Sequence, residues 1–186
     1  SRTGWRKPLK LFESLIQSMS QDRMILLLHE LMKNSKRSDR DLAKILGVSQ
    51  PTLTRMRKRL ERDGYILDYT AIPNMTKLGF EVTAFTFLNI DRYDAKTGEL
   101  DVALGERAHK WVAHNSKIIF AAGGEGLEGK NCMMLSVHRD FTAFTEFISD
   151  FRAQWTARIK NIDSFLVSLK GKMPKQFSLR NLEIIP

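Results

Sequence analysis

The segment that most restricts the fold of this chain places one glycine between two short helical patterns. Ser38 followed by Asp41 forms a capping box, which predicts that a helix begins at this point. Gly47 ends that pattern and supplies the backbone freedom that a sharp turn requires. Ser49 then caps a second helix, and Pro51 lies in its first turn, where the missing N–H of proline does no harm. The spacing predicts a helix, a tight turn and another helix.

The second of these helices has two chemically different faces. Leu53, Met56 and Leu60 recur at the spacing of one helical stripe, so this face is expected to be buried. The opposite face is polar and basic, and it consists of Thr54, Arg55, Lys58, Arg59 and Arg62. A helix that is apolar inside and basic outside, behind a glycine turn, indicates a helix-turn-helix, whose second helix lies in the major groove of DNA.

Two roles toward DNA are expected along this helix. Side chains of its first turns reach base edges, and the candidates are Ser49, Gln50, Thr52, Thr54 and Arg55. Cations contact phosphates, and the candidates are Lys58, Arg59 and Arg62, with Arg37 and Arg40 as further DNA-binding residues. Asp63 and Gly64 then turn the chain into an alternating stretch at residues 65–69, which predicts the strand of a wing.

The positive charge of the chain is concentrated in the same region. Residues 1–62 hold 15 Lys and Arg against 6 Asp and Glu, which accounts for the whole formal net charge of +9. Charge alone fits a polyanion partner or a solvated basic face equally well, and the caps, stripe and basic face together favour double-stranded DNA. No apolar run approaches the roughly 18–20 residues of a membrane span. A single cysteine, Cys132, excludes an internal disulfide, and a reducing, cytoplasmic setting is expected.

The remaining two-thirds of the chain alternates strand and helix patterns. Strands are predicted at residues 82–90, 118–122, 132–137 and 165–169. Helices are predicted around two apolar stripes, Leu104, Ala108, Trp111 and Val112 in the first and Phe141, Phe144, Ile148, Phe151 and Trp155 in the second. The order β-α-β-β-α-β is the ferredoxin-like pattern. The predicted fold class is therefore α+β, with an N-terminal winged helix-turn-helix joined to a ferredoxin-like domain.

The first strand of the ferredoxin-like domain is apolar on both faces. Ala84 and Leu88 lie on one face, whereas Phe85 and Phe87 lie on the other. Helices cover only one face of such a sheet, so a monomer would expose the aromatic side chains of the other face to water. Burial against a second copy removes this exposure, and we expect a homodimer or a higher homo-oligomer.

Two stretches of the chain resemble the Lrp/AsnC family of prokaryotic transcription regulators. DLAKILGVSQPTLTRMRKRLERDGYI is similar to the DNA-binding core of the family, although Arg57 stands where the family usually has an apolar residue. YTAIPNMTKLGFEVTAFTFLNI is similar to its hinge and the first strand of its regulatory domain. The resemblance implies DNA-bound dimers, often in larger rings, with effectors, commonly amino acids, near the loop between the second and third strands. We expect a sequence-specific DNA-binding regulator, not an enzyme, that a small molecule modulates.

The patterns and the resemblance together divide the chain into five segments. The predicted segments are a basic arm with a short helix (residues 1–20), a winged helix-turn-helix DNA-binding domain (21–72), a hinge (73–81), a ferredoxin-like regulatory and dimerisation domain (82–172) and a tail (173–186).

The loop GGEGLEGKN, residues 123–131, has the glycine spacing of a phosphate-binding loop, but Asn131 replaces its Ser or Thr. A phosphate-binding loop runs into a helix, whereas residues 132–137 are predicted as a strand. A hairpin turn without a ligand, or an effector loop, therefore fits better. The usual Gly-x-x-Asp turn of the family is not evident here. The candidate effector-binding residues are Gly123, Gly124, Glu125, Lys130, Asn131 and Cys132.

Two other functions are compatible with this architecture. A tetrapyrrole (siroheme-type) decarboxylase-like enzyme would resemble it, with histidine and tyrosine around the second strand, where this chain has His114 but no tyrosine. A small-molecule sensor without direct DNA contact would not need the local charge surplus. The four histidines are scattered, so neither a metal site nor a cofactor is expected.

Overall fold

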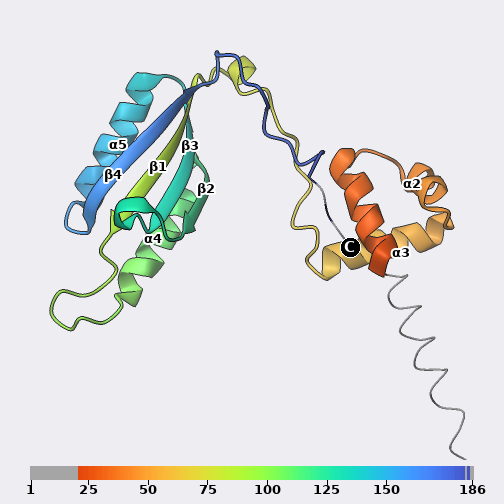
Figure 1. The fold of residues 1–186 in the computed structure, drawn as a ribbon, viewed down its shortest axis with the longest axis horizontal. Coiled ribbons are helices and arrows are strands. Elements are labelled where there is room, and N and C mark those ends of the chain that lie inside the picture. The colour runs from red at the N-terminus through yellow and green to blue at the C-terminus, as the bar shows by residue number, and fades with distance from the viewer. Residues whose placement is uncertain (1–20, 183, 185–186) are drawn as a thin grey trace, which may run out of the picture. The chain divides into compact units, whose positions relative to one another are not determined.

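The computed structural model describes residues 21–182 and residue 184, with the exception of the Leu127 side chain, and it divides into two compact units (Figure 1). The first unit comprises residues 1–71 and 175–186, and the second comprises residues 72–174. The predicted basic arm and short helix at residues 1–20 lie outside the described residues. The predicted domain boundaries stay predictions.

The described part of the first unit contains three helices around a small apolar core. A helix at residues 21–33 is followed by α2 (Asp39–Leu46) and α3 (Gln50–Arg62). Ser38 caps α2, because its hydroxyl accepts a hydrogen bond from the Asp41 amide at 3.2 Å. Gly47 has the positive φ of 65° that ends α2 and opens the turn. The fully buried leucines of the core are Leu27, Leu42, Leu53 and Leu60.

The wing strand predicted at residues 65–69 is absent from the described structure, which has no regular element there. A strand requires a neighbouring strand for its backbone hydrogen bonds, and this segment has none beside it among the described residues. Two of its amides bond to α3 instead, since both Tyr65 and Ile66 donate to the carbonyl of Leu60. Ile66 packs on the core, whereas Leu67 is 93% exposed.

The second unit is a four-stranded antiparallel sheet with the strand order β2-β3-β1-β4. Its elements follow the chain as β1 (Val82–Ile90), α4 (Val102–His114), β2 (Ile118–Gly123), β3 (Cys132–His138), α5 (Phe141–Trp155) and β4 (Ile159–Ser168). Short 3-10 turns at Thr76–Leu78 and Leu127–Gly129 complete it. The element order confirms the predicted ferredoxin-like pattern and the α+β class.

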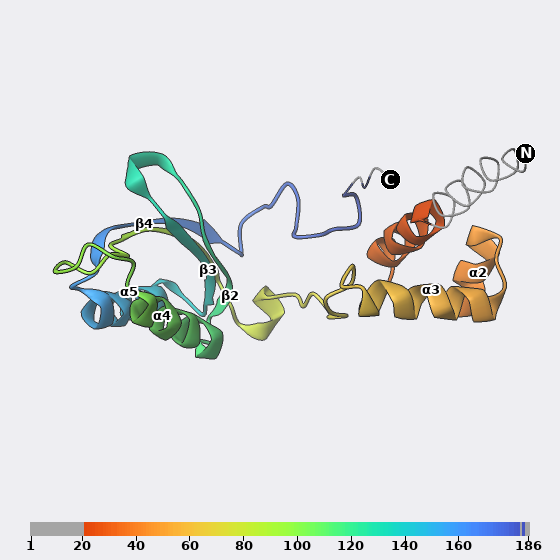
Figure 2. The ribbon, with the colours of Figure 1, turned by 90° about the horizontal axis from the view of Figure 1, so that it is seen from below.

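Both long helices, α4 and α5, lie on the same side of the sheet (Figure 2). The core between helices and sheet is formed by Leu88, Leu104, Met134, Phe147, Phe151 and Trp155. Two details differ from the predictions. β4 begins at Ile159, six residues before the predicted start, because pairing with the whole length of β1 extends it. Phe141, which was predicted in the buried stripe of α5, is 62% exposed, whereas Phe147 is buried in the core.

Candidate nucleic-acid interface

The turn between α2 and α3 fixes where the candidate interface begins. Ser49 caps α3, with its hydroxyl 2.8 Å from the hydroxyl of Thr52 and 3.4 Å from the Thr52 amide. These two predicted base-contacting side chains therefore also complete the cap, whose loss generally costs about 1 kcal/mol. Gln50, the first residue of α3, is exposed. Leu53 and Leu60 are fully buried, so the opposite face of α3 is turned to solvent.

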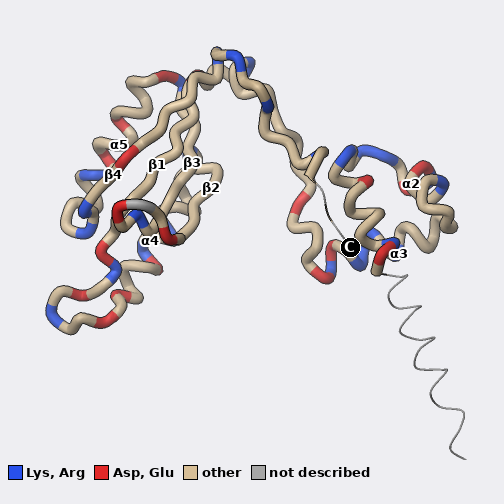
Figure 3. The backbone as a smooth tube through the Cα atoms, in the orientation of Figure 1, with Lys and Arg blue, Asp and Glu red and all other residues tan. Residues whose placement is uncertain are grey.

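The exposed face of α3 carries four of the predicted cations, Arg55, Lys58, Arg59 and Arg62. Arg59 and Arg62 share the carboxylate of Asp63, at 3.2 and 2.9 Å. The hydrogen bonds from Arg62 and Arg59 lower the pKa of Asp63. Arg55 and Lys58 form no ion pair with any described residue, and they are the cations of this face most available to a polyanion. Figure 3 marks the positions of Lys and Arg along the backbone.

Thr54 lies at the edge of this face, and its hydroxyl is hydrogen-bonded within the protein. Its hydroxyl donates to the carboxylate of Asp39, at the start of α2, over 2.7 Å. The same hydroxyl lies 3.1 Å from the carbonyl of Gln50. The structure therefore directs Thr54 toward α2, in contrast to the exposed cations of α3.

Arg57 is a residue that the sequence reasoning did not assign to the site. It forms a partly buried ion pair with Asp39 at 2.7 Å and also approaches the Tyr69 hydroxyl at 3.5 Å. Burial would raise the pKa of Asp39, but the hydrogen bonds from Thr54 and Arg57 outweigh it, and this pKa is lowered. In the sequence, the only indication of this role was that Arg57 lies next to the apolar stripe of Leu53, Met56 and Leu60. Its partner, 18 residues earlier, follows from no local spacing.

Of the two other predicted DNA-binding residues, Arg37 is half-buried and ion-paired with Glu30 of the preceding helix. Hydrogen bonding from Lys33 is the main cause that lowers the pKa of Glu30, and Arg37 contributes. Arg40 is exposed in the first turn of α2. The structure thus brings Arg40 to the surface of the unit, whereas Arg37 is engaged within it.

The chain is similar in sequence and in structure to known DNA-binding proteins. Residues 21–66 match the family described as winged helix-turn-helix DNA-binding. The HTH-type transcriptional regulator FL11 of Pyrococcus furiosus is 26% identical, over 60% of this chain and 87% of that protein. The structure of Escherichia coli AsnC is similar, with a TM-score of 0.64 at 18% identity, covering 86% of this chain and 95% of that one. The chain is a DNA-binding transcriptional regulator with the Lrp/AsnC fold.

A further solved structure has a similar fold. The transcriptional regulator from Neisseria meningitidis, solved as a complex with L-Met, has a TM-score of 0.67 at 17% identity. It covers 87% of this chain and 97% of that chain. At this level of identity the likeness establishes the fold. Among the described residues of the regulator, no helix is long and apolar enough to cross a membrane.

The glycine-rich loop of the regulator is the turn of the β2–β3 hairpin. It runs into a strand, β3, and not into a helix, so the geometry of a phosphate-binding loop is absent there. Asn131 binds the backbone of Ile90 twice, its side-chain oxygen accepting at 3.0 Å and its amide donating at 2.8 Å. Lys130 is ion-paired with Asp163 of β4, with its side chain only 10% exposed. Two predicted effector-binding side chains are therefore tied to neighbouring strands.

The other predicted effector-binding residues differ in accessibility. Gly123, Gly124 and Glu125 are exposed, and the Gly124 amide donates to the carbonyl of Asn131. Burial raises the pKa of the Cys132 thiol. At the tip of the hairpin Gly129 has a φ of 73°, and an added Cβ would lie 2.9 Å from the Asn89 amide nitrogen. Among the predicted effector-binding residues, Glu125 thus carries the exposed side chain that could meet a ligand.

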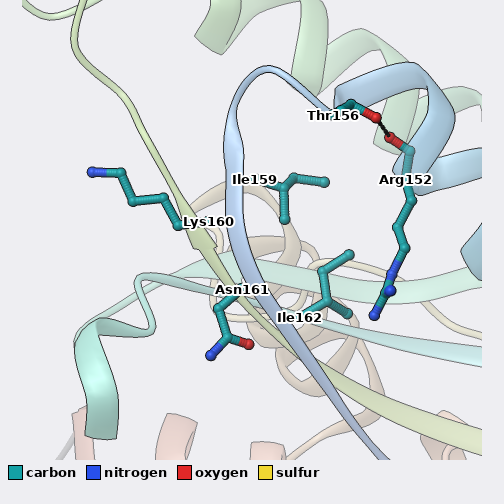
Figure 4. Close-up of a pocket in the computed structure, with 6 residues that line it drawn as sticks. All are labelled: Arg152, Thr156, Ile159, Lys160, Asn161 and Ile162. Carbon is teal, nitrogen blue, oxygen red and sulfur yellow. Dashed lines mark hydrogen bonds between the residues drawn. The ribbon is translucent and has the colours of Figure 1, made fainter.

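A shallow hollow of about 360 Å³ lies elsewhere in the second unit, between the end of α5 and the start of β4 (Figure 4). Its lining residues are Arg152, Thr156, Ile159, Lys160, Asn161 and Ile162. The amine of Lys160 pairs with Asp91 at 3.1 Å, and the Thr156 hydroxyl donates to the Arg152 carbonyl at 2.6 Å. None of the predicted site residues lies in this hollow. The described residues contain no cluster of three or more His, Cys, Asp or Glu that could hold a metal ion.

Proposed function

We propose that the regulator recognises specific sequences of double-stranded DNA by placing α3 in the major groove. The observation that carries the proposal is the exposed basic face of α3 behind a stripe of fully buried leucines. Such a face supplies cations to phosphates while the first turns of the helix approach base edges. No observation favours the decarboxylase-like enzyme or the sensor without DNA contact.

Arg55 and Lys58 are expected to contribute differently to DNA binding. Arg55→Ala should cost about 1–3 kcal/mol on the preferred duplex and relax sequence preference, because Arg55 lies in the turns that reach base edges. Lys58→Ala should weaken binding to all duplexes alike and lower the slope of log affinity against log salt by about 0.9, as one phosphate contact is lost. Fluorescence anisotropy titrations at several salt concentrations measure both.

Each variant serves as the control for the other, because both side chains are exposed and neither forms an ion pair with a described residue. A preferred duplex for the titrations is obtained by selection from random-sequence duplexes with the full chain. A sequence-selective loss with Lys58→Ala would mean that the two roles are reversed. Unchanged binding by both variants would contradict docking through this face of α3.

We also propose that the regulator is a homodimer that buries the face of the sheet opposite to α4 and α5. One row of large apolar side chains crosses all four strands on this face, since Phe120 pairs with Leu135, Leu135 with Phe85, and Phe85 with Phe165. Phe120 and Phe165 are 52% and 67% exposed. An apolar row of this extent marks an interaction surface, and a second copy offers the same complementary row.

Phe165→Glu is expected to convert the dimer to a monomer, because a charge at the β4 end of this row would be buried in the dimer without a partner. Light scattering after gel filtration at micromolar concentration should then give a mass near 21.4 kDa, half that of the wild type. Gln154→Glu, which adds the same charge to the exposed surface of α5, should leave the dimer mass unchanged. A wild-type mass near 21.4 kDa would contradict the proposed dimer.

The β2–β3 hairpin is the proposed place of action of a small-molecule effector, an amino acid being the first class to test. Support comes from the exposure of Gly123, Gly124 and Glu125, and from the L-Met complex of the Neisseria meningitidis regulator. Titration calorimetry of the full chain with individual amino acids tests this proposal, with Glu125→Gln as the comparison.

A further inference from the structure

The carboxylate of Asp39 connects the two helices of the helix-turn-helix. One oxygen, Oδ2, accepts a hydrogen bond from the Thr54 hydroxyl at 2.7 Å. The other oxygen, Oδ1, lies 2.8 Å from Nε and 2.7 Å from Nη2 of Arg57. Because Thr54 and Arg57 are three residues apart, they lie on the same flank of α3. A single side chain at the start of α2 thus holds α3 by two successive turns.

Arg57 also has further partners, which occupy the rest of its guanidinium. Nη1 lies 3.5 Å from the hydroxyl of Tyr69, and Nη2 lies 3.5 Å from the carbonyl of Arg37. The Tyr69 hydroxyl in turn donates to the carboxylate of Glu61 at 3.0 Å. The Arg57 side chain is only 17% exposed. Unlike Arg55 and Lys58, it is therefore engaged within the unit and has little surface to offer to a phosphate.

The apolar contacts of α3 oppose its rotation about its own axis only weakly. Leu53 and Leu60 anchor one stripe of the helix, but apolar contacts are non-directional, so a small rotation about the helix axis changes their burial little. Hydrogen bonds to a carboxylate have defined directions and are stronger than neutral ones. Bonds from Thr54 and Arg57, on the flank of the helix, oppose that rotation. Readout of base edges depends on the rotation of α3, because each bidentate contact requires a defined side-chain position.

We infer that Asp39 and Arg57 are positioning residues for sequence readout, which fix the rotation of α3 about its own axis without contacting DNA. The inference rests on the proposed docking of α3 in the major groove and adds the device that orients it. A direct consequence is that this pair affects the preference between sequences more than the general affinity for DNA. A phosphate contact has the opposite signature, since it strengthens binding to every sequence.

The experiment compares the full chain with Arg57→Met, Asp39→Asn and the double variant. Two probes are used, the best duplex selected from a random pool and an unselected random-sequence duplex. Each single variant is expected to lower the ratio of the two affinities at least tenfold, with the salt slope for the random duplex unchanged. The double variant is expected to lose no more than the larger single loss, because the two residues act through one contact.

The ratio separates positioning from a general loss of folded protein, since a smaller folded fraction lowers both affinities equally. Thermal unfolding of each variant is recorded alongside, and Lys58→Ala is the control that changes the salt slope but not the ratio. A lower salt slope with an unchanged ratio for Arg57→Met would identify Arg57 as a phosphate contact and overturn the inference. Additive losses in the double variant would overturn it as well. Failure of the proposed function appears separately, as unchanged binding by Arg55→Ala and Lys58→Ala.

Discussion

Trp155→Ala is expected to lower the free energy of unfolding of the second unit by about 3–5 kcal/mol, the usual cost of truncating a large core aromatic residue. Trp155, the last residue of α5, is 5% exposed. Its ring packs against Trp111 of α4 and Phe151 of α5, with centroids 6.3 and 6.4 Å apart. The side chain therefore joins the two helices that cover the sheet, and its removal leaves a cavity between them.

Trp155→Phe is the matched control for this prediction. The indole nitrogen of Trp155 is buried without a hydrogen-bond partner among the described residues, and such an unpaired donor is itself unfavourable. Phenylalanine keeps most of the apolar ring and removes this donor, so the loss should stay below about 1.5 kcal/mol. Urea unfolding followed by far-ultraviolet circular dichroism measures both variants. Equal losses in the two would mean that the ring is not packed between the helices.

Acid is expected to destabilise the second unit through His138, by up to about 3 kcal/mol between pH 6.5 and pH 4. His138 is 2% exposed and lies between the rings of Phe144 and Phe147. Burial, assisted by the nearby charge of Lys117, lowers its pKa from 6.5 to about 4. In this window the unfolded chain binds a proton that the folded protein does not bind. Stability is therefore highest above pH 6.5 and falls as the pH approaches 4.

The His138 contribution is measured as a difference between variants, because carboxylates also titrate in this range. In urea unfolding at pH 7 and pH 4.5, His138→Gln should lose about 2–3 kcal/mol less than the wild type. Glutamine retains a hydrogen-bonding group for Ser136, whose hydroxyl lies 2.8 Å from Nε2 of His138. The exposed His109→Gln is the matched control and should lose as much as the wild type. Equal losses in wild type and His138→Gln would contradict the prediction.

The local geometry of the helix-turn-helix was predicted correctly where each signal involved neighbours in sequence. Ser38 and Ser49 cap the helices at which they were expected, and Gly47 has the left-handed conformation that the turn required. Leu53 and Leu60 are buried, so the cations on the opposite side of α3 are exposed. Caps and stripes involve residues three or four positions apart, and their physics needs no knowledge of distant partners.

The errors arose where the outcome depended on a distant segment. Residues 65–69 alternate like a strand, but no neighbouring strand pairs with them in the described structure. Phe141 fits the apolar spacing of α5, yet Phe147 faces the core, because the rotation of the helix on the sheet selects the buried side chains. Lys130 and Asn131 stay candidates for a ligand, and the structure adds that their side chains have partners in Asp163 and Ile90.

The order of elements, the α+β class and the basic face of α3 could be inferred from the sequence, because periodicity, capping and charge are properties of short segments of the chain. The position of Asp39 beside Thr54 and Arg57 could not be inferred in this way, because those residues are 15 and 18 positions away in the chain. The same holds for the apolar row of Phe120, Leu135, Phe85 and Phe165 across four strands. Contacts between distant residues depend on how whole elements pack and register, and that packing is a property of the folded chain and not of any short segment.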